Sequence, residues 1–567
     1  MSDTIIKTEG KKVSDKKRTS IFLNINVSCI ATSMLGTALT TALPPIMKDL
    51  NISVNTGQWL TSGFALFLAV MTPFTAYLIT RFRTKKLYCT AIGFFIVGLT
   101  ICACSNNFWT MMLGRIIQGC GNGLLSSMAQ VIILTIFPPE RIGTIMGWYG
   151  LSIGVAPIIS PTIAGLLVDS VGWRMIFIIA ISIMLVSLIC AIFIFEDVLP
   201  TMNKHFDVIS LFFSALAFGD ITLAVGNMGT YDFVSYQVLL ALIIGVITSI
   251  IFVWRQLHIK VPFLDVRVLK NKDYSISLTA TVILQLILMG SAIIFPVYVQ
   301  QIKGYSATIS GLVVLPGSLA MAVISPFAGK IYDKIGMKLL FIIGSSALAI
   351  GNLAIYFIDI HQSVWIIASV NILRCLSFGS LLMPLVTWAM KDIPKTKASD
   401  ATALFNSIRF IGGAVGSALF ISIMTKVANA VVDTKENPKM YGINIVFLIM
   451  SILSVIILLL GIFACKQSPT KKNVKDQEKE KEMKELSSDD KLNIDIVIAD
   501  EKASNKKSTD TISETDTIIY NEISIDELSI KDKSDTDTII EEPSIDEITP
   551  KADSEIEVII NNDNNKL

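Results

Sequence analysis

The sequence predicts an all-α integral membrane protein with fourteen transmembrane helices, arranged as two six-helix bundles with a two-helix insertion. Of its 567 residues, 52% are hydrophobic and only 16% are charged, and the mean hydropathy is +0.63. Soluble globular domains have about a quarter charged residues, so this composition favours a lipid environment. The apolar residues form long runs, and the two halves of the chain share a repeated segment.

Each apolar run is long enough to cross a bilayer, which takes roughly 20 helical residues. Lipid accepts only segments that satisfy their own backbone hydrogen bonds, so each run is predicted to be a helix. The fourteen expected helices cover residues 21–45, 57–80, 86–104, 109–133, 141–168, 173–195, 207–226, 235–254, 276–301, 307–331, 338–357, 363–390, 399–425 and 442–465.

The connecting loops alternate in charge. Basic residues follow the even-numbered helices, as at 81–86, 330–338 and 391–397, whereas the loops at 105–108, 227–233 and 359–362 contain no Lys or Arg. Lys435 and Lys439 are an exception on the second side. Short basic loops stay in the cytoplasm, so both termini are predicted to be cytoplasmic and the chain to be a multi-pass protein of the cytoplasmic membrane.

An internal repeat predicts the division of the chain. The segment TPFTAYLITRFRTKKL at 72–87 aligns without gaps with SPFAGKIYDKIGMKLL at 325–340. The expected parts are an N-terminal segment at 1–19, a six-helix bundle at 20–195, inserted helices and a basic loop at 196–272, a second bundle at 273–465, and a tail at 466–567. Folds built from two such halves hold substrate between them and rock one half against the other.

The tail differs sharply from the rest of the chain. Residues 466–567 contain 15 Lys, no Arg and 27 Asp or Glu, a net charge of −12, whereas the preceding residues carry +13. With Tyr520 as its only aromatic residue, this segment is expected to be a disordered, acidic cytoplasmic tail whose protein partner, if any, the sequence does not identify.

Polar residues inside apolar runs are the candidate coupling and gating residues. Arg115 lies within the fourth run and is expensive there unless it faces a cavity or a partner, although snorkelling to the interface is the alternative. Asp220 is the one carboxylate well inside a run, and hydration near the helix end is its alternative role. The fifth helix has small and kinking residues, which suit close packing or a hinge: Gly150, Gly154, Pro157, Pro161 and Gly165.

Substrate contacts are expected from polar and aromatic residues on bundle-interior helices, because wide apolar pockets with few polar anchors bind varied amphiphiles. Any one of these residues could instead be an interhelical hydrogen-bond partner. The candidates are Thr37, Trp59, Gln118, Gln285, Tyr298, Asn371, Arg374 and Asn406.

Several functions are disfavoured. With three His and no matching His, Asp and Ser or Cys set, the chain is not expected to be an enzyme. The eight Cys lie in or beside apolar runs, so no metal site or cofactor is expected. The sequence contains no GxxxxGK[ST] motif, so neither ATP nor nucleic acid is an expected partner.

The motifs together resemble the major facilitator superfamily over residues 20–465, in particular its fourteen-span drug:proton antiporter branch and the lincosamide-type multidrug exporters within it. GRIIQGCGNG resembles the helix-four motif around Arg115 and Gly119, and GLSIGVAPIISPTIAG at 150–165 resembles the helix-five antiporter motif. The second-half loop retains Asp333 and Gly336 of a gating motif. Further agreement lies in TALPPI, QWLTSG, GWRMIF, GLVVLPG and FNSIRFIGGAVGSAL.

Two positions depart from the family pattern. The first helix has small or hydrophobic residues around Leu35, and the loop after helix two has Thr80, where the family often has acids. The resemblance implies a secondary transporter that exports drugs or other small amphiphiles, cations among them, in exchange for protons by alternating access. The alternatives are a transporter for one endogenous solute or lipid, and a membrane sensor or scaffold acting through the tail.

Overall fold

The computed structural model describes residues 6–8, 13–202, 206–228 and 235–465. The tail prediction for 466–567 therefore lies outside the described residues. The described chain is almost wholly helical, and its long helices match the fourteen predicted spans to within a few residues. Thirteen of them are long and apolar enough to cross a membrane. The remaining one is α5, which has several side chains outside the described set.

The long helices are listed here in chain order: α1 (Asp15–Asp49), α2 (Val54–Arg81), α3 (Thr84–Ala103), α4 (Phe108–Ile136), α5 (Ile142–Ser170), α6 (Arg174–Ile194), α7 (Val208–Asn227), α8 (Tyr236–His258), α9 (Lys272–Pro296), α10 (Ala307–Ile335), α11 (Met337–Tyr356), α12 (Val364–Met390), α13 (Ala398–Ala430) and α14 (Pro438–Phe463). A π-helical turn, η3 (Val297–Ile302), extends α9. Short 3-10 turns are η1 (Pro139–Arg141), η2 (Val266–Lys270) and η4 (Lys395–Lys397). Two short strands, β1 (Ile6–Thr8) and β2 (Thr201–Met202), pair antiparallel.

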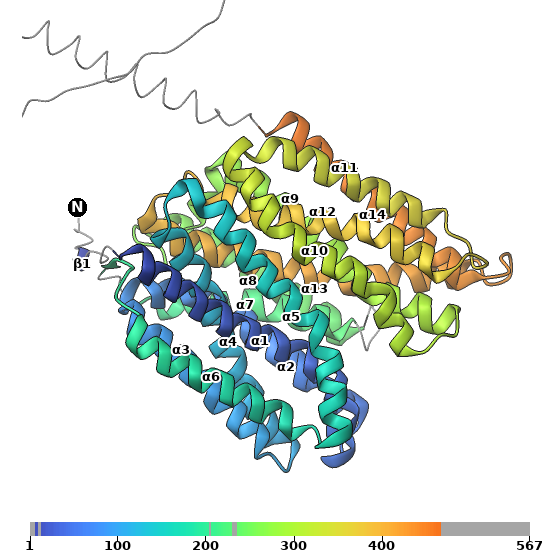
Figure 1. The fold of residues 1–567 in the computed structure, drawn as a ribbon, viewed down its shortest axis with the longest axis horizontal. Coiled ribbons are helices and arrows are strands. Elements are labelled where there is room, and N and C mark those ends of the chain that lie inside the picture. The colour runs from blue at the N-terminus through green and yellow to red at the C-terminus, as the bar shows by residue number, and fades with distance from the viewer. Residues whose placement is uncertain (1–5, 9–12, 203–205, 229–234, 466–567) are drawn as a thin grey trace, which may run out of the picture. The chain divides into compact units, whose positions relative to one another are not determined.

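The packing repeats with an offset of eight helices. In the first set α1 packs on α5, α2 on α4, α3 on α4, and α3 on α6; in the second, α9 packs on α13, α10 on α12, α11 on α12, and α11 on α14. Figure 1 shows α3 and α6 at one edge and α11 and α14 at the opposite edge, with α5, α10 and α13 between them. The internal duplication seen in the sequence is thus also a duplication of helix packing.

Helices α7 and α8 pack mainly on each other, and α7 also contacts α2 and α13. Asp207, at the start of α7, accepts hydrogen bonds from the backbone and hydroxyl of Ser210 at 3.1 and 2.6 Å. Arg255 of α8 pairs with the same carboxylate at 3.1 Å. Burial alone would raise the pKa of Asp207, but these donors hold it below its ordinary value. The hairpin therefore loses this stabilisation as the pH falls through that lowered pKa.

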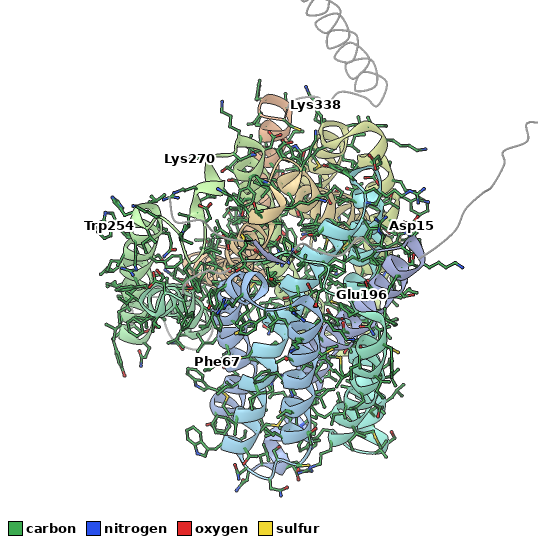
Figure 2. The ribbon with its side chains drawn as sticks, turned by 90° about the vertical axis from the view of Figure 1, so that its left-hand side faces the viewer. Asp15, Phe67, Glu196, Trp254, Lys270 and Lys338 are labelled. Carbon is green, nitrogen blue, oxygen red and sulfur yellow. The ribbon has the colours of Figure 1, made fainter. Side chains whose placement is uncertain are left out.

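We call the end of the helices where α1 begins and α2 finishes the basic end, because Arg81, Lys334 and Lys391 lie there. Figure 2 shows Asp15, Glu196, Lys270 and Lys338 towards this end of the molecule. Lys17 of α1 forms an ion pair with Glu196 after α6. At the other end Arg174 donates to Asp49 at 2.8 Å and to the carbonyl of Ser105 at 3.0 Å, joining the ends of α1, α3 and α6.

Small residues set the closest contacts within the first bundle. A Cβ on Gly98 of α3 would lie 2.7 Å from the carbonyl oxygen of Gly114 and 2.8 Å from the backbone nitrogen of Gln118, both in α4. Gly93 of the same helix has no atom within 4 Å of its would-be Cβ. Because lipid is as apolar as the helix surfaces, the hydrophobic effect does not drive helices together in a membrane. Close backbone packing of this kind therefore holds α3 on α4.

Replacing Gly98 with Ala is expected to push α3 from α4 and to destabilise the protein by about 1–3 kcal/mol. The measurement is the melting temperature of the detergent-solubilised chain. Gly93→Ala, on the same helix but facing open space, is the control and should leave the melting temperature unchanged. Equal effects of the two variants would contradict the packing described here.

Candidate functional site

The two bundles meet closely along the first turns of α5 and the last turns of α10. A Cβ on Gly147 of α5 would lie 2.9 Å from the Cα of Pro326, and one on Gly150 would lie 2.7 Å from the hydroxyl of Ser325. Further along α5, nothing lies within 4 Å of a Cβ on Gly154 or Gly165. The close contact between the bundles thus lies at the basic end of α5. Of the three glycines predicted in this helix, only Gly150 takes part in it.

Asp333, near the end of α10, stabilises this contact between α5 and α10. Its carboxylate accepts hydrogen bonds from the backbone nitrogens of Gly143 and Thr144 at 2.8 and 2.7 Å and from the Thr144 hydroxyl at 2.5 Å. These are the free N–H groups of the first turn of α5, where the helix dipole also favours negative charge. Gly336 ends α10 at φ 88°, a conformation that suits glycine, and starts α11. The predicted gating pair Asp333 and Gly336 therefore lies where the two bundles touch.

The corresponding place in the other half has no such acid. Thr80 aligns with Asp333 in the repeat, and its hydroxyl bonds to the carbonyls of Ala76 and Tyr77 in its own helix at 3.2 and 2.9 Å. The α2–α13 contact is the counterpart of the α10–α5 contact under the eight-helix offset. The α10–α5 contact therefore has a carboxylate bonded to the start of the facing helix. Its counterpart, the α2–α13 contact, has Thr80 at the matching position.

A second polar bridge crosses the interface at the same end. Asn406 of α13 donates to the side-chain oxygen of Gln130 in α4 at 3.0 Å, and both residues are buried. Asn406, predicted as a substrate contact, thus joins the bundles in this conformation.

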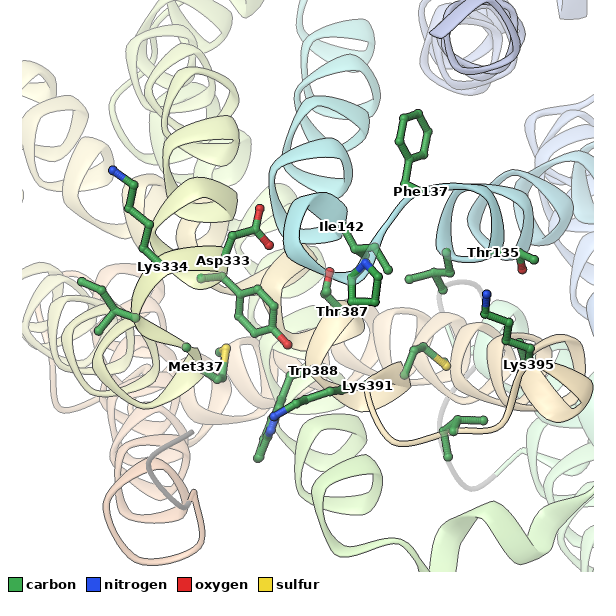
Figure 3. Close-up of a pocket in the computed structure, with 18 residues that line it drawn as sticks. Thr135, Phe137, Ile142, Asp333, Lys334, Met337, Thr387, Trp388, Lys391 and Lys395 are labelled. Atoms are coloured by element: carbon green, nitrogen blue, oxygen red, sulfur yellow. The ribbon is translucent and has the colours of Figure 1, made fainter. Parts of the chain in front are cut away.

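A cavity of about 280 Å³ lies at the basic end between the bundles. Figure 3 shows Asp333 directed towards the start of α5 at Ile142, with Lys334, Lys391 and Lys395 around the same cavity. Its walls come from the ends of α4 and α5 in one bundle and of α10, α12 and α13 in the other. Separation of the bundles would open this cavity.

Another cavity, of about 260 Å³, lies towards the opposite end between α2, α7, α9 and α13. Trp59, a predicted substrate contact, lines it together with Gln58, Ser62, Thr222, Asn227 and Ser417. The remaining wall is mainly aliphatic. Because α7 forms one side, the inserted hairpin contributes to a cavity between the two bundles.

Arg115 lies inside the first bundle. Its guanidinium donates to the carbonyl of Leu60 at 3.0 Å and to the side-chain oxygen of Gln118 at 2.7 Å, and it stacks 4.2 Å from the centre of the Phe64 ring. Gly119 allows this contact, because a Cβ there would lie 2.8 Å from the carbonyl of Phe64. These three partners of Arg115 are neutral, in line with the acid-poor sequence around it.

Arg374 and Asn371, two of the predicted substrate contacts, lie inside the second bundle. Arg374 donates to Asn352 of α11 at 2.6 Å and to Asn371 at 3.1 Å, and is surrounded by the rings of Phe295, Phe378 and Phe447. It is fully buried among four helices of one bundle. Interhelical hydrogen bonding, the alternative considered for these residues, is what the geometry supports.

The other predicted residues are dispersed. Gln285 of α9 packs beside Gly413 of α13. Tyr298 is buried at the start of η3, where its hydroxyl has no hydrogen-bond partner among the described residues. Asp220 is partly buried in the middle of α7, with no ion pair or hydrogen bond within the described part of the chain. The side chains of Thr37, Pro157 and Pro161 lie outside the described set.

One arginine was missed by the sequence reasoning. Arg409 of α13 lies three residues after the bridging Asn406, and its Nε is buried without a partner among the described residues. It belongs to the FNSIRFIGGAVGSAL segment, which was noted only as a motif. The signal that could have found it is the one used for Arg115, an ionisable residue well inside an apolar run.

Comparison with known proteins agrees with this architecture. Residues 21–417 match the Major Facilitator Superfamily. The chain belongs to the major facilitator superfamily. It is 33% identical over 427 residues to the uncharacterized MFS-type transporter YcnB of Bacillus subtilis (strain 168), covering 75% of this chain and 90% of the relative. It is 31% identical over 438 residues to the lincomycin resistance protein LmrB of the same organism, covering 76% and 91%.

Among solved structures, the proton:xylose symporter XylE superposes with a TM-score of 0.56 at 14% identity, covering 79% of this chain and 96% of that one. This match supports the major facilitator fold alone. The predicted family and the all-α membrane fold are therefore confirmed. The chain is a transporter with many membrane-spanning helices rather than an enzyme, and its relatives include a lincomycin resistance protein.

The Asp333 contact can be tested directly. Asp333→Asn keeps the shape of the side chain but removes the charge that strengthens its bonds to the start of α5, so these amides should exchange hydrogen about tenfold faster or more. The measurement is hydrogen–deuterium exchange of peptides covering 142–150. Asp392→Asn, an exposed carboxylate at the same end, is the control, and unchanged exchange in Asp333→Asn would contradict the contact's role.

Proposed function

We propose that this chain exports drugs or other small amphiphilic compounds across the cytoplasmic membrane by proton antiport, using alternating access. The observation that carries the proposal is the unequal contact between two related bundles. They are fastened at the basic end by Asp333 and by the Asn406–Gln130 bridge, while Gly154 and Gly165 of α5 have no close contact further along. Such an arrangement fits one of the two states that a rocking mechanism needs.

The positive-inside rule supports a cytoplasmic position for the basic end. In that orientation both termini face the cytoplasm, and the fastened contact closes the cytoplasmic side. The cavity lined by Trp59 then belongs to the outer half of the protein. We also propose the division into bundles at 20–195 and 273–465, with 196–272 inserted, because it follows the repeated packing of the helices.

Support for drugs as the substrate class comes from the relatives, since LmrB is named for lincomycin resistance. The described cavities fit amphiphiles because they combine aliphatic walls with a few polar side chains. Transport by this superfamily works within the membrane on small substrates, and nothing in the sequence points to ATP as the energy source.

For proton coupling, Asp220 is our candidate. It is a membrane carboxylate with no ion pair or hydrogen bond among the described residues, so it is free to gain and lose a proton. Asp333, by contrast, is occupied by the first turn of α5. Arg115, with Gly119 and Gln118, is proposed to support the coupling indirectly by holding α2 against α4.

The proposal predicts protonophore-sensitive efflux of an amphiphilic dye, tested with one anionic and one cationic dye, from energised cells that express the chain. Asp220→Asn should abolish drug-driven proton movement in proteoliposomes, while leaving the purified protein folded, because the amide cannot carry a proton. Asp392→Asn serves as the matched control. Efflux that persists in full with the protonophore would exclude proton antiport, and undiminished proton movement in Asp220→Asn would remove that residue from the mechanism.

A further inference from the structure

Three arginines lie well inside the apolar helices, and they differ in what surrounds them. Arg115 bonds to oxygens of Leu60 and Gln118 within the first bundle. Arg374 bonds to oxygens of Asn352 and Asn371 within the second. Arg409 has neither a hydrogen bond nor an ion pair in the described part of the chain.

Arg409 lies about 16 Å along α13, taking 1.5 Å per residue from Ala398, and therefore within the hydrocarbon depth. Its side chain is partly accessible, but its Nε is fully enclosed and unpaired. The guanidinium lies 5.2 Å from the centre of the neighbouring Phe410 ring. That ring offers weak attraction and no hydrogen-bond acceptor.

The position of Arg409 is at the interface rather than inside one bundle. It interacts electrostatically with Tyr149 of α5, a residue of the first bundle that is only 1% exposed. Three residues earlier on α13, Asn406 bonds to Gln130 of α4 in that same bundle. Arg409 therefore belongs to the second bundle but lies beside residues of the first.

The titratable groups around Arg409 provide no negative charge. The electrostatic partner from α5 is Tyr149, whose hydroxyl accepts from the thiol of Cys29 in α1 at 3.8 Å. Tyr149 also interacts with Tyr88 of α3, which is paired with Ser28 at 2.7 Å. In the described part of the chain, the electrostatic partner of Arg409 is therefore a phenol and not a carboxylate.

A guanidinium at this depth is costly when it has no counter-charge and its buried Nε has no acceptor. The guanidinium fork suits a planar or tetrahedral oxyanion, which can accept two parallel hydrogen bonds from it. We propose that Arg409 is the binding group for the anionic head of the substrate, so that the preferred substrates are organic anions, carboxylates or sulfonates on an aromatic or aliphatic body. This inference rests on the proposed function, since it names the substrate class of that transporter.

This inference also reverses the expectation that the substrates include cations. A fixed positive charge between the bundles repels a lipophilic cation, which would have to approach Arg409 without a compensating carboxylate. Arg115 and Arg374 do not produce the same selection, because each is enclosed within one bundle by oxygen acceptors and aromatic rings. Of these three arginines, Arg409 is therefore the one whose charge can act on a substrate between the bundles.

The test uses two xanthene dyes of similar size and opposite charge, fluorescein as the anion and rhodamine 123 as the cation. Binding to the purified full-length protein is followed by fluorescence polarisation. The wild type should prefer fluorescein. Arg409→Gln should weaken fluorescein binding by about tenfold or more, the loss of a charge-assisted hydrogen bond, without weakening rhodamine 123 binding. Arg409→Lys should restore most of the affinity for fluorescein.

Three results would overturn the inference: fluorescein affinity unchanged in Arg409→Gln, equal loss of both dyes in a variant that elutes as the wild type does on size exclusion, or a wild type that fails to prefer the anion. The dye assay needs no transport. If fluorescein binding depends on Arg409 but no protonophore-sensitive efflux is seen, the proposed function is wrong and the binding site remains supported. If cations are exported and substitution of Arg409 changes neither dye's binding, the proposed function remains supported and the binding site is wrong.

Discussion

The bonds between Asp333 and the first turn of α5 are the contact on which the observed conformation depends. They join the two bundles through a carboxylate and three donors, at 2.5 to 2.8 Å, at the end of the molecule where both helices emerge from the apolar region. Glycines 143 and 147 allow the backbones to approach closely enough for those bonds to form. A contact of this kind holds firmly while closed, yet its groups are near enough to water to be solvated when it opens.

Polar groups deeper in the helices follow a different rule, because lipid offers them no alternative partner. Arg115 and Arg374 are each hydrogen-bonded within their own bundle, although Nη2 of Arg374 is buried without a partner among the described residues. The exceptions are informative. Asp220 and Arg409 lack partners among the described residues and lie on helices α7 and α13, which contact more than one part of the fold. Rigid bundles with unpaired groups between them are what a transporter requires.

Much of the fold could be predicted from the sequence. The second helix, expected at 57–80, spans Val54–Arg81, because hydrophobic length and backbone satisfaction in lipid determine such segments. Asp333 was also indicated as a gating residue by the family motif in the loop of the second half. The partners of Arg374 and Asn406 were not, because they come from residues 22 and 276 positions away. Spacing likewise suggested close packing at both Gly150 and Gly154, but only the first faces α10 within the closed part of the interface.

The central claim is that transport requires the bundles to separate at the basic end. The most direct measurement introduces Gln130→Cys and Asn406→Cys, whose native side chains bond at 3.0 Å, and follows dye efflux before and after treatment with a short reducible cross-linker. The account predicts that cross-linking stops efflux, that reduction restores it, and that neither single-cysteine variant responds. Full efflux by the cross-linked double variant would contradict the rocking mechanism.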